Sequence, residues 1–295
     1  MSDDSLRWLG PKPDLTDPVL IVMLTGWIDA GGAARAAMEA IELESEATPV
    51  AEFDDDVYVD YRARRPVMEL RDGLNTVLQW ERITIGTGVD QAGRDLVVMS
   101  GPEPDTAWHR FTRLVGDTAT ELGITAMAHL GAYPFAVPHT RPARISVSSP
   151  SQDVLARVPF LRSSIDVPAG VAASLEHELH DRGIPSIGIW AQVPHYISTM
   201  AYPAASVALL DGLREATDVV LDATTLRSDV MIQGRRIDAM VAGNAEHAQM
   251  IAQLEEIYDE SDGSVELTDD VDDSLEMRSG DELAAELEEF LREQD

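Results

Sequence analysis

The first group of residues that could carry chemistry follows the apolar run from Val19 to Leu24. The loop after this run supplies a hydroxyl, an indole, a carboxylate and three glycines, namely Thr25, Gly26, Trp27, Asp29, Gly31 and Gly32. Glycine allows close approach of the backbone, and the free amides at a helix start attract anions. The loop therefore indicates an anion-binding turn, although a tight strand-to-helix turn is the commoner use of such glycines.

Two carboxylates follow the next apolar run along the chain. Glu103 and Asp105 stand in a loop that begins at Gly101. Paired carboxylates can divide acid and base roles when their surroundings separate their pKa values. The simpler interpretation is that Asp105 caps the following helix and that Glu103 is solvated.

The loop from Gly131 to Pro142 combines aromatic, basic and proline residues. It contains Tyr133, His139 and Arg141, and its prolines make it rigid. Loops of this kind often form the lip of a binding site, but the same residues can serve packing alone. The sequence is compatible with both interpretations, a binding lip and a packing role.

A fourth loop adds His195 and Tyr196 after another apolar run. The histidines of the third and fourth loops could meet Asp29 or Glu103 in an acid–base pair or a metal site. No spacing typical of a metal-binding or catalytic motif supports either arrangement. We therefore expect no metal and no cofactor.

Two arginines lie outside these loops, in the stretch after Asp54-Asp55-Asp56. Two-residue alternation would place Tyr58, Asp60, Arg62 and Arg64 on one face of a strand. Arg62 and Arg64 could then hold a carboxylate or a phosphate between them. A solvated edge strand protected by its charges is the simpler alternative.

These loops connect short apolar runs, which favour strands, with stretches that have the apolar spacing of helices. This alternation is typical of an α/β fold with a mostly parallel sheet. Ligands bind such a sheet at the carboxyl ends of its strands, where the four loops would converge. The expected strands are 19–24, 95–100, 124–130, 184–193 and 145–149. The expected helices are 33–43, 107–122, 169–182 and 204–216.

The rest of the chain divides into further segments. Residues 1–17 form an arm before a core domain of residues 18–224, and the turn Asp72-Gly73 predicts a hairpin insertion at about 52–85. Residues 225–258 are expected to form a helical extension, 259–280 an acidic linker and 281–295 a tail helix.

Charge and composition exclude several classes of protein. The 295 residues carry 53 acids against 22 basic residues, a net charge of −31, which disfavours a nucleic-acid partner. About half of that charge lies in residues 255–295, which hold 18 acids and two arginines. The chain has no cysteine and no apolar run long enough to span a bilayer, and its acidic first ten residues are not expected to be a secretory leader. We therefore expect a cytoplasmic protein without a membrane partner.

Several of these motifs, in this order, resemble the actinobacterial branch of the proteasome assembly chaperone 2 family. The resemblance extends from about Pro18 to Leu291 and is carried by the runs 24–32, 53–66, 101–105, 131–142 and 193–196. It implies a three-layer core similar to phosphorylase/hydrolase-like folds and a homo-oligomer, with a trimer as one plausible size. It implies no known reaction.

Two functions of different classes follow. The favoured one is a non-catalytic assembly or binding protein with a protein partner, since the family likeness points there and no catalytic spacing is present. The alternative is an enzyme or sensor that binds a small anionic or nucleoside-like ligand at the carboxyl ends of the strands.

Overall fold

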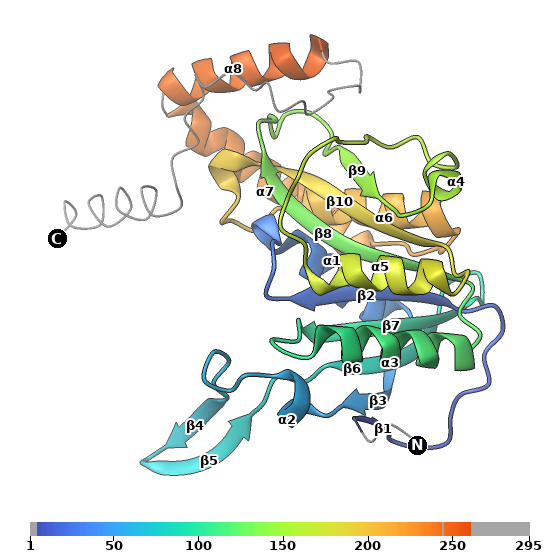
Figure 1. Cartoon of the computed structure of the whole chain (residues 1–295). Helices are drawn as coiled ribbons and strands as arrows, with labels where there is room; N and C mark the ends of the chain where they lie inside the picture. Colours follow the sequence, from blue (N-terminus) through green and yellow to red (C-terminus); the bar gives the residue numbers. More distant parts are fainter. Residues whose placement is uncertain (1–4, 244, 261–295) are drawn as a thin grey trace.

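The computed structural model describes residues 5–243 and 245–260 of the chain, and its centre is an eight-stranded sheet (Figure 1). The strand order is β1-β3-β6-β7-β2-β8-β10-β9. Neighbours among β7, β2, β8 and β10 pair in parallel, whereas all other neighbours pair antiparallel. The sheet is therefore mixed, and the expectation of a mostly parallel sheet was wrong. The strands are Leu6–Trp8 (β1), Val19–Thr25 (β2), Thr48–Phe53 (β3), Thr84–Val89 (β6), Asp95–Pro102 (β7), Ala126–Phe135 (β8), Ile145–Ser148 (β9) and Ser186–Pro194 (β10).

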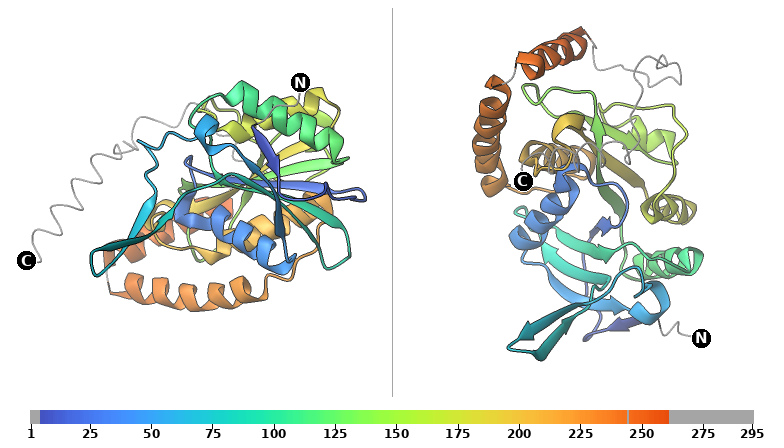
Figure 2. Two further views of the ribbon diagram at one scale, coloured as in Figure 1. Left: turned by 90° about the horizontal axis from the view of Figure 1, so that it is seen from below. Right: turned by 90° about the vertical axis from the view of Figure 1, so that its left-hand side faces the viewer.

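Helices cover both faces of this sheet and make three layers (Figures 1 and 2). In β2, Ile21 belongs to one apolar core and Val22 to the other, because successive side chains point to opposite faces. Helices α1 (Ala33–Glu44) and α6 (Pro203–Thr217) pack on the first core, and α3 (Trp108–Glu121) and α5 (Val171–Asp181) pack on the second. None of the described helices is long and apolar enough to cross a membrane.

The region between β3 and β6 departs from the sequence-based expectation. Asp54 accepts a hydrogen bond from the backbone amide of Asp56 at 3.2 Å and starts the short helix α2 (Asp55–Tyr58). Turns follow this helix, so the expected strand with Arg62 and Arg64 on one face does not form. The hairpin itself is confirmed, but it is smaller than 52–85, since β3 and β6 belong to the main sheet. It consists of β4 (Val67–Arg71) and β5 (Leu74–Gln79) and projects from the body (Figure 1).

Two helices follow the core, in the segment 225–258 that was expected to form a helical extension. They are α7 (Thr224–Ala242) and α8 (Ala245–Glu260). Residues 259 and 260, assigned above to an acidic linker, end α8. The remainder of that linker and the expected tail helix lie outside the described residues. The short elements are α4 (Gln152–Leu155) and the 3-10 turns η1 (Ala30–Gly32) and η2 (His195–Ile197).

Candidate functional site

The first two loops meet at the carboxyl ends of β2 and β7. The parallel register places Thr25 beside Pro102. The backbone amide of Glu103 donates to the carbonyl of Thr25 at 2.6 Å, and the Thr25 hydroxyl donates to the carbonyl of Gly101 at 3.4 Å. Neighbouring parallel strands thus bring the two loops together.

Asp29 holds the start of α1 with its own carboxylate. Its two side-chain oxygens accept from the amides of Ala34 at 2.8 Å and Arg35 at 3.1 Å. Burial raises the pKa of Asp29, and these amides oppose the rise. The amides at the start of α1 attract negative charge, and the Asp29 carboxylate of the same chain supplies it.

The glycine amides of this loop also have protein acceptors. The Gly31 amide donates to the carbonyl of Ser198 at 2.6 Å, and the Gly32 amide donates to the carbonyl of Asp29 at 3.1 Å. An added anion would have to compete with these acceptors. The contact of Gly31 with Ser198 also joins the first loop to the fourth.

Glu103 is buried, so the expectation that it is solvated was wrong. Its Oε1 accepts from the amide of Val171, the first residue of α5. A Cβ at Gly170 would lie 3.1 Å from Glu103 Oε1 and 3.2 Å from Trp27 Cδ1, so glycine lets these side chains close over the helix start. Trp27 remains 45% exposed at this rim.

Asp105 binds Arg64 instead of capping α3. The Arg64 Nε lies 3.2 Å from each carboxylate oxygen, and the amide of Asp60 donates to Asp105 Oδ2 at 2.9 Å. The helix starts after Ala107 without a side-chain cap, which corrects the expected role of Asp105. Arg64 also covers Gly26, where a Cβ would collide with the Arg64 Nη2.

Arg62 does not join Arg64 in this arrangement. Its side chain is exposed, and its backbone amide donates to Asp60 Oδ1 at 2.8 Å. The turn between the two arginines separates them, so the structure brings Arg64 and not Arg62 to the first two loops.

The third and fourth loops meet at Tyr196. Its hydroxyl lies 2.8 Å from both the backbone amide and the Nδ1 of His139. The His139 Nε2 lies 3.2 Å from Asp238 on α7, and the His195 Nδ1 lies 3.4 Å from the carbonyl of Phe135. Burial raises the pKa of Tyr196 to about 12. Tyr196 is therefore a neutral hydrogen-bonding centre at neutral pH.

Tyr133 lies inside a strand, because β8 continues to Phe135 beyond the predicted end at 130. Its hydroxyl lies 3.1 Å from Ser146 Oγ and accepts from Gln192 at 3.1 Å. Gln192 is buried, and its Oε1 has no hydrogen-bond partner within residues 5–243 and 245–260.

The raised pKa of Tyr196 predicts a stability loss in alkali. Between about pH 10 and pH 12 the unfolded chain releases this proton while the folded chain keeps it, so the free energy of unfolding falls as the pH rises. Tyr196→Phe should remove this contribution. Urea unfolding at several pH values should then show a shallower fall for the variant than for the wild type; parallel curves would contradict the assignment.

Helix α8 is held on the third loop by charge. Arg141 binds Asp259 at 2.8 and 2.7 Å and Glu255 at 3.1 Å. Thr140 also donates to Glu255, and Arg144 lies 3.6 Å from the centre of the Tyr258 ring. Arg141 thus has two carboxylate partners from its own chain.

Arg141→Gln should loosen α8 without unfolding the core, because it removes ion pairs to Glu255 and Asp259 that are weak individually but lie at one end of the helix. Amide exchange in residues 245–260 should accelerate several-fold, and raised salt should do the same to the wild type by screening. Arg35→Gln is the matched control, since Arg35 pairs with Glu39 at 4.0 Å on the exposed face of α1. Equal exchange in both variants would contradict the role of Arg141.

The four loops therefore meet in two pairs. The bridge between Asp29 and Ala132 and the Gly31 contact with Ser198 join the pairs through backbone. Among residues 5–243 and 245–260, no hydrogen bond connects Glu103 or Asp105 to His139 or His195. In the same ranges, no group of three histidines and acids is arranged to hold a metal ion.

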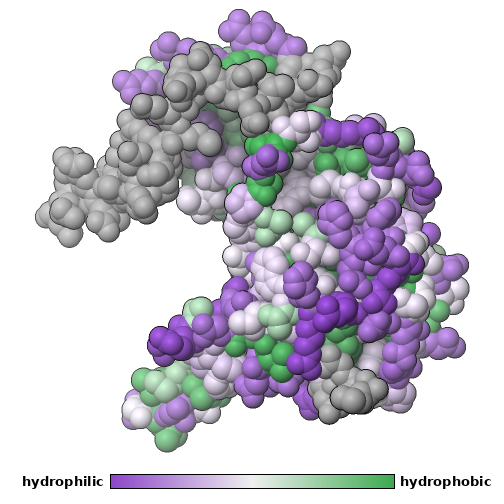
Figure 3. Space-filling model, viewed as in Figure 1, coloured by the Kyte–Doolittle hydropathy of each residue, from purple (hydrophilic) through white to green (hydrophobic). Residues whose placement is uncertain are grey.

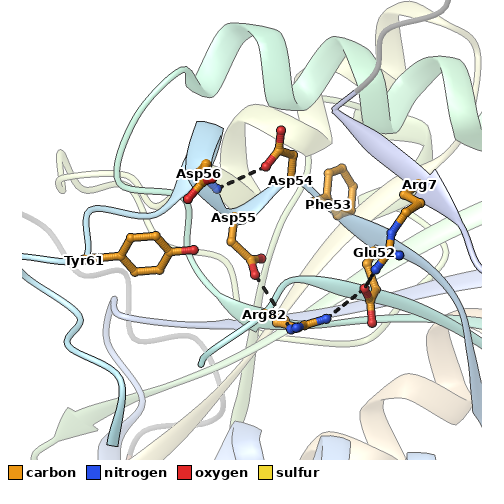
Figure 4. Close-up of a pocket in the computed structure, with 8 residues that line it drawn as sticks. All are labelled: Arg7, Glu52, Phe53, Asp54, Asp55, Asp56, Tyr61 and Arg82. Atoms are coloured by element: carbon orange, nitrogen blue, oxygen red, sulfur yellow. Dashed lines mark hydrogen bonds and ion pairs between the residues drawn. The ribbon is translucent and has the colours of Figure 1, made fainter. Parts of the chain in front are cut away.

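A cavity of about 360 Å³ at the β1–β3 edge was missed by the sequence analysis (Figure 4). Glu52 binds Arg7 at 2.6 Å and Arg82 at 3.0 Å there, and Asp55 Oδ2 lies 3.8 Å from Arg82. Burial raises the pKa of Asp55, whose Oδ1 has no hydrogen-bond partner in the described part of the chain. Acids outnumber arginines in the lining by four to two, so the cavity favours a cation over an anion. The run Asp54-Asp55-Asp56 was the available signal.

A buried polar cluster under α5 was also missed. His129 Nε2 lies 2.6 Å from Glu176 Oε1, and the Ser148 hydroxyl donates to the same oxygen at 3.0 Å. Both His129 and Glu176 are at least 96% buried. A histidine inside the apolar run of β8 was the signal that could have revealed the pair.

The PAC2 family model matches residues 23–241. A Corynebacterium glutamicum protein of unknown function is 30% identical, with a TM-score of 0.82, over 87% of this chain and 97% of its own. A Mycobacterium tuberculosis protein of unknown function is 32% identical, with a TM-score of 0.80, over 88% of this chain and 90% of its own. No curated protein matches the chain.

A third similar structure is that of a Mycobacterium tuberculosis protein described as a proteasome-assembly chaperone homologue. It is 31% identical, with a TM-score of 0.73, over 79% of this chain and 99% of its own. The family match spans most of the described core, and these relatives cover most of the chain at 30% identity or more. The chain belongs to the PAC2 family.

Proposed function

We propose that this chain is a non-catalytic assembly or binding protein. The observation that carries the proposal is that polar groups at the carboxyl ends of the strands already bind other parts of the same chain. Asp29 and Glu103 hold helix starts, the amides of Gly31 and Gly32 bind carbonyls, and Arg141 binds two carboxylates of α8. A catalytic site needs acids, bases and donors directed at a substrate, whereas these groups are directed at their own chain.

The relatives support a role in assembly. One similar structure is named a proteasome-assembly chaperone homologue. We therefore propose subunits of the proteasome ring as the protein partner and self-association into a homo-oligomer as the working state. The cysteine-free composition suits action in the reducing cytoplasm.

The proposal is tested with recombinant proteasome subunits from the organism that supplies this chain. The full chain should comigrate with incomplete rings and accelerate their conversion to complete rings, as followed by native gels and sedimentation. Bovine serum albumin at the same concentration controls for crowding. Absence of both comigration and acceleration would overturn the proposal.

The alternative remains an enzyme or sensor for a small anionic or nucleoside-like ligand, consistent with a phosphorylase/hydrolase-like fold. It is favoured by the position of Arg141, a bidentate carboxylate binder at the strand ends. A thermal-shift screen of nucleosides, nucleotides and carboxylates tests it. A stabiliser that loses its effect with Arg141→Ala, but not with Arg35→Ala, would favour the alternative.

A further inference from the structure

The cavity of about 360 Å³ at the β1–β3 edge is assembled from four parts of the chain (Figure 4). β1 supplies Arg7, residues 52–56 supply four acids, the turn after α2 supplies Tyr61, and the segment before β6 supplies Arg82. None of the described residues that line it belongs to the four loops at the strand ends. Its volume lies at the lower end of the range for small-molecule sites. The cavity is therefore a second candidate site, separate from the strand ends.

The two arginines of the lining are already paired. Arg7 and Arg82 bind the same oxygen, Oε2 of Glu52, at 2.6 and 3.0 Å. An added anion would have to displace this carboxylate from between them. The lining holds four acids and two arginines, so two negative charges remain in excess, and they belong to the run Asp54-Asp55-Asp56. The cavity therefore attracts cations.

The Asp55 carboxylate receives no hydrogen bond from the residues that the structure describes. Its Oδ1 is enclosed and unpartnered, and its Oδ2 lies 3.8 Å from the Arg82 Nε, beyond hydrogen-bond distance. Burial raises the pKa of Asp55, Arg82 opposes the rise, and the neighbouring carboxylates add to it. A largely buried carboxylate without donors is costly, and its two oxygens exchange by rotation about the last side-chain bond. A cation that carries N–H groups would supply both the charge and the donors that Asp55 lacks.

An aromatic wall stands beside this carboxylate. Tyr61 directs its hydroxyl toward the side of the cavity where Asp55 lies (Figure 4). Trp80 packs edge-on against the Tyr61 ring, with 4.7 Å between the ring centres. Trp80 follows β5 at the base of the hairpin, whose apolar side chains form the projection seen in Figure 3. Ammonium groups bind favourably at aromatic rings, so the wall suits an organic cation.

A bare metal ion fits this cavity less well. Magnesium and calcium require several oxygen ligands at short distances. Among the described residues, no group of three acids or histidines is arranged to hold a metal ion. A cavity of this volume instead suits a ligand of several heavy atoms.

We propose that this cavity is a binding site for an aliphatic diamine. One ammonium group is held by Asp55 beside Tyr61, and the second lies by the exposed carboxylates of Asp54 and Asp56. The carbon chain between them packs on the rings of Phe53 and Tyr61. Two positive charges match the excess of two negative charges in the lining. The site uses none of the groups at the strand ends, so it is independent of the proposed assembly role.

Isothermal titration of the purified full chain at physiological salt tests the site, with diaminobutane as the probe. Butylamine is the matched monoamine. Diaminobutane should bind at least about tenfold more tightly, because its second charge pairs with a second carboxylate. No binding of diaminobutane, or equal binding of butylamine, would overturn the proposal.

Two further probes separate the diamine from other cations. Nα-acetyl-lysine methylamide stands for a lysine side chain of another protein, and magnesium chloride stands for a metal or a diffuse counter-ion. Both should bind at least about tenfold more weakly than diaminobutane. Equal binding of the lysine derivative would show a protein partner instead, and equal binding of magnesium would show a cation site without selectivity. Either result would overturn the proposal.

Variants locate the binding within the chain. Asp55→Asn removes the inner charge and keeps the shape of the side chain, so the affinity for diaminobutane should fall at least about tenfold. Glu39→Gln removes one charge on the exposed face of α1 and should leave the affinity unchanged. Equal affinities of the two variants would show that the general charge of the chain attracts the probe, and would overturn the proposal. The comparison of diaminobutane with butylamine on the wild type needs no variant, so it decides even if Asp55→Asn does not fold.

Discussion

Replacing Glu176 by alanine is expected to lower the free energy of unfolding by about 3–5 kcal/mol, the usual effect of breaking a buried pair from one side. Glu176 Oε1 lies 2.6 Å from His129 Nε2 and accepts from the Ser148 hydroxyl at 3.0 Å. The variant would leave the imidazole and the hydroxyl buried without their acceptor, and buried polar groups that lose their partners are costly. The methylenes removed from the core add to the loss.

Urea unfolding of the full chain measures this effect. Glu176→Gln keeps an acceptor oxygen at the same place, so it should lose clearly less stability than Glu176→Ala. Glu39→Ala is the matched control on the exposed face of α1, where a change within about 0.5 kcal/mol is expected. If Glu176→Ala and Glu39→Ala had the same midpoint, the buried pair would have no stabilising role.

The buried pair also matters for the strand ends. It ties α5 to β8 and, through Ser148, to β9. The first residue of the same helix donates to Glu103. Loss of Glu176 should therefore loosen the rim at Gly170 and Trp27 as well as the core, because both contacts act on one rigid helix.

The central strands were predictable because both of their faces are buried, so nearly every residue in them is apolar. The run Val19–Leu24 is apolar at every position, and the structure buries alternate residues against opposite helix layers. Helices α1 and α3 begin and end within two residues of the predicted bounds, since each follows a glycine-containing loop and has a clear apolar period. These predictions depend on local pattern alone.

The antiparallel half of the sheet was not predictable in the same way. β3 and β6 are separated by the α2 turn and the hairpin, and their pairing depends on contacts between residues more than 30 positions apart, such as Thr48 with Thr87. Alternation in the stretch after Asp54 suggested a strand, but Asp54 caps a helical turn there. A cap competes with a strand over a few residues, and the periodic pattern alone could not decide between them.

The roles of the site residues were also predictable only where they depend on nearby residues. Gly-rich loops before helices and carboxylates near helix starts are the signals of anion binding, yet they also serve local capping. Asp29 acts within six residues of its own position, which a sequence can suggest. Glu103 binds a helix start 68 residues away. Only the parallel order of the strands brings those two segments together.

Replacing Gly101 by alanine is expected to lower the free energy of unfolding by about 3 kcal/mol or more, the combined cost of strained backbone and overpacking. Gly101 has a φ of +134°, which L side chains rarely adopt. A Cβ there would lie 2.2 Å from the carbonyl oxygen of Arg82 and 2.8 Å from the Cα of Ile83. Both atoms are backbone, so no side chain can turn away to make room.

Gly123→Ala is the matched control, because it separates strain from collision. Gly123 also has a positive φ, of +69°, but no atom lies within 4 Å of its Cβ position. It should therefore lose only about 1 kcal/mol, the cost of a left-handed backbone alone. Urea unfolding of the two variants measures the difference.

The Gly101 collision also bears on the site. Gly101 pairs with Leu24, one position before the end of the β7–β2 pairing, and lies two residues before Glu103. If the strand shifts to relieve the collision, Glu103 withdraws from the amide of Val171 and the start of α5 is freed. Amide exchange at Val171 should then accelerate in Gly101→Ala and not in Gly123→Ala. If both variants lost the same stability and Val171 stayed protected in both, the close approach of Arg82 would not hold the strand end in place, and Glu103 would be positioned by α5 alone.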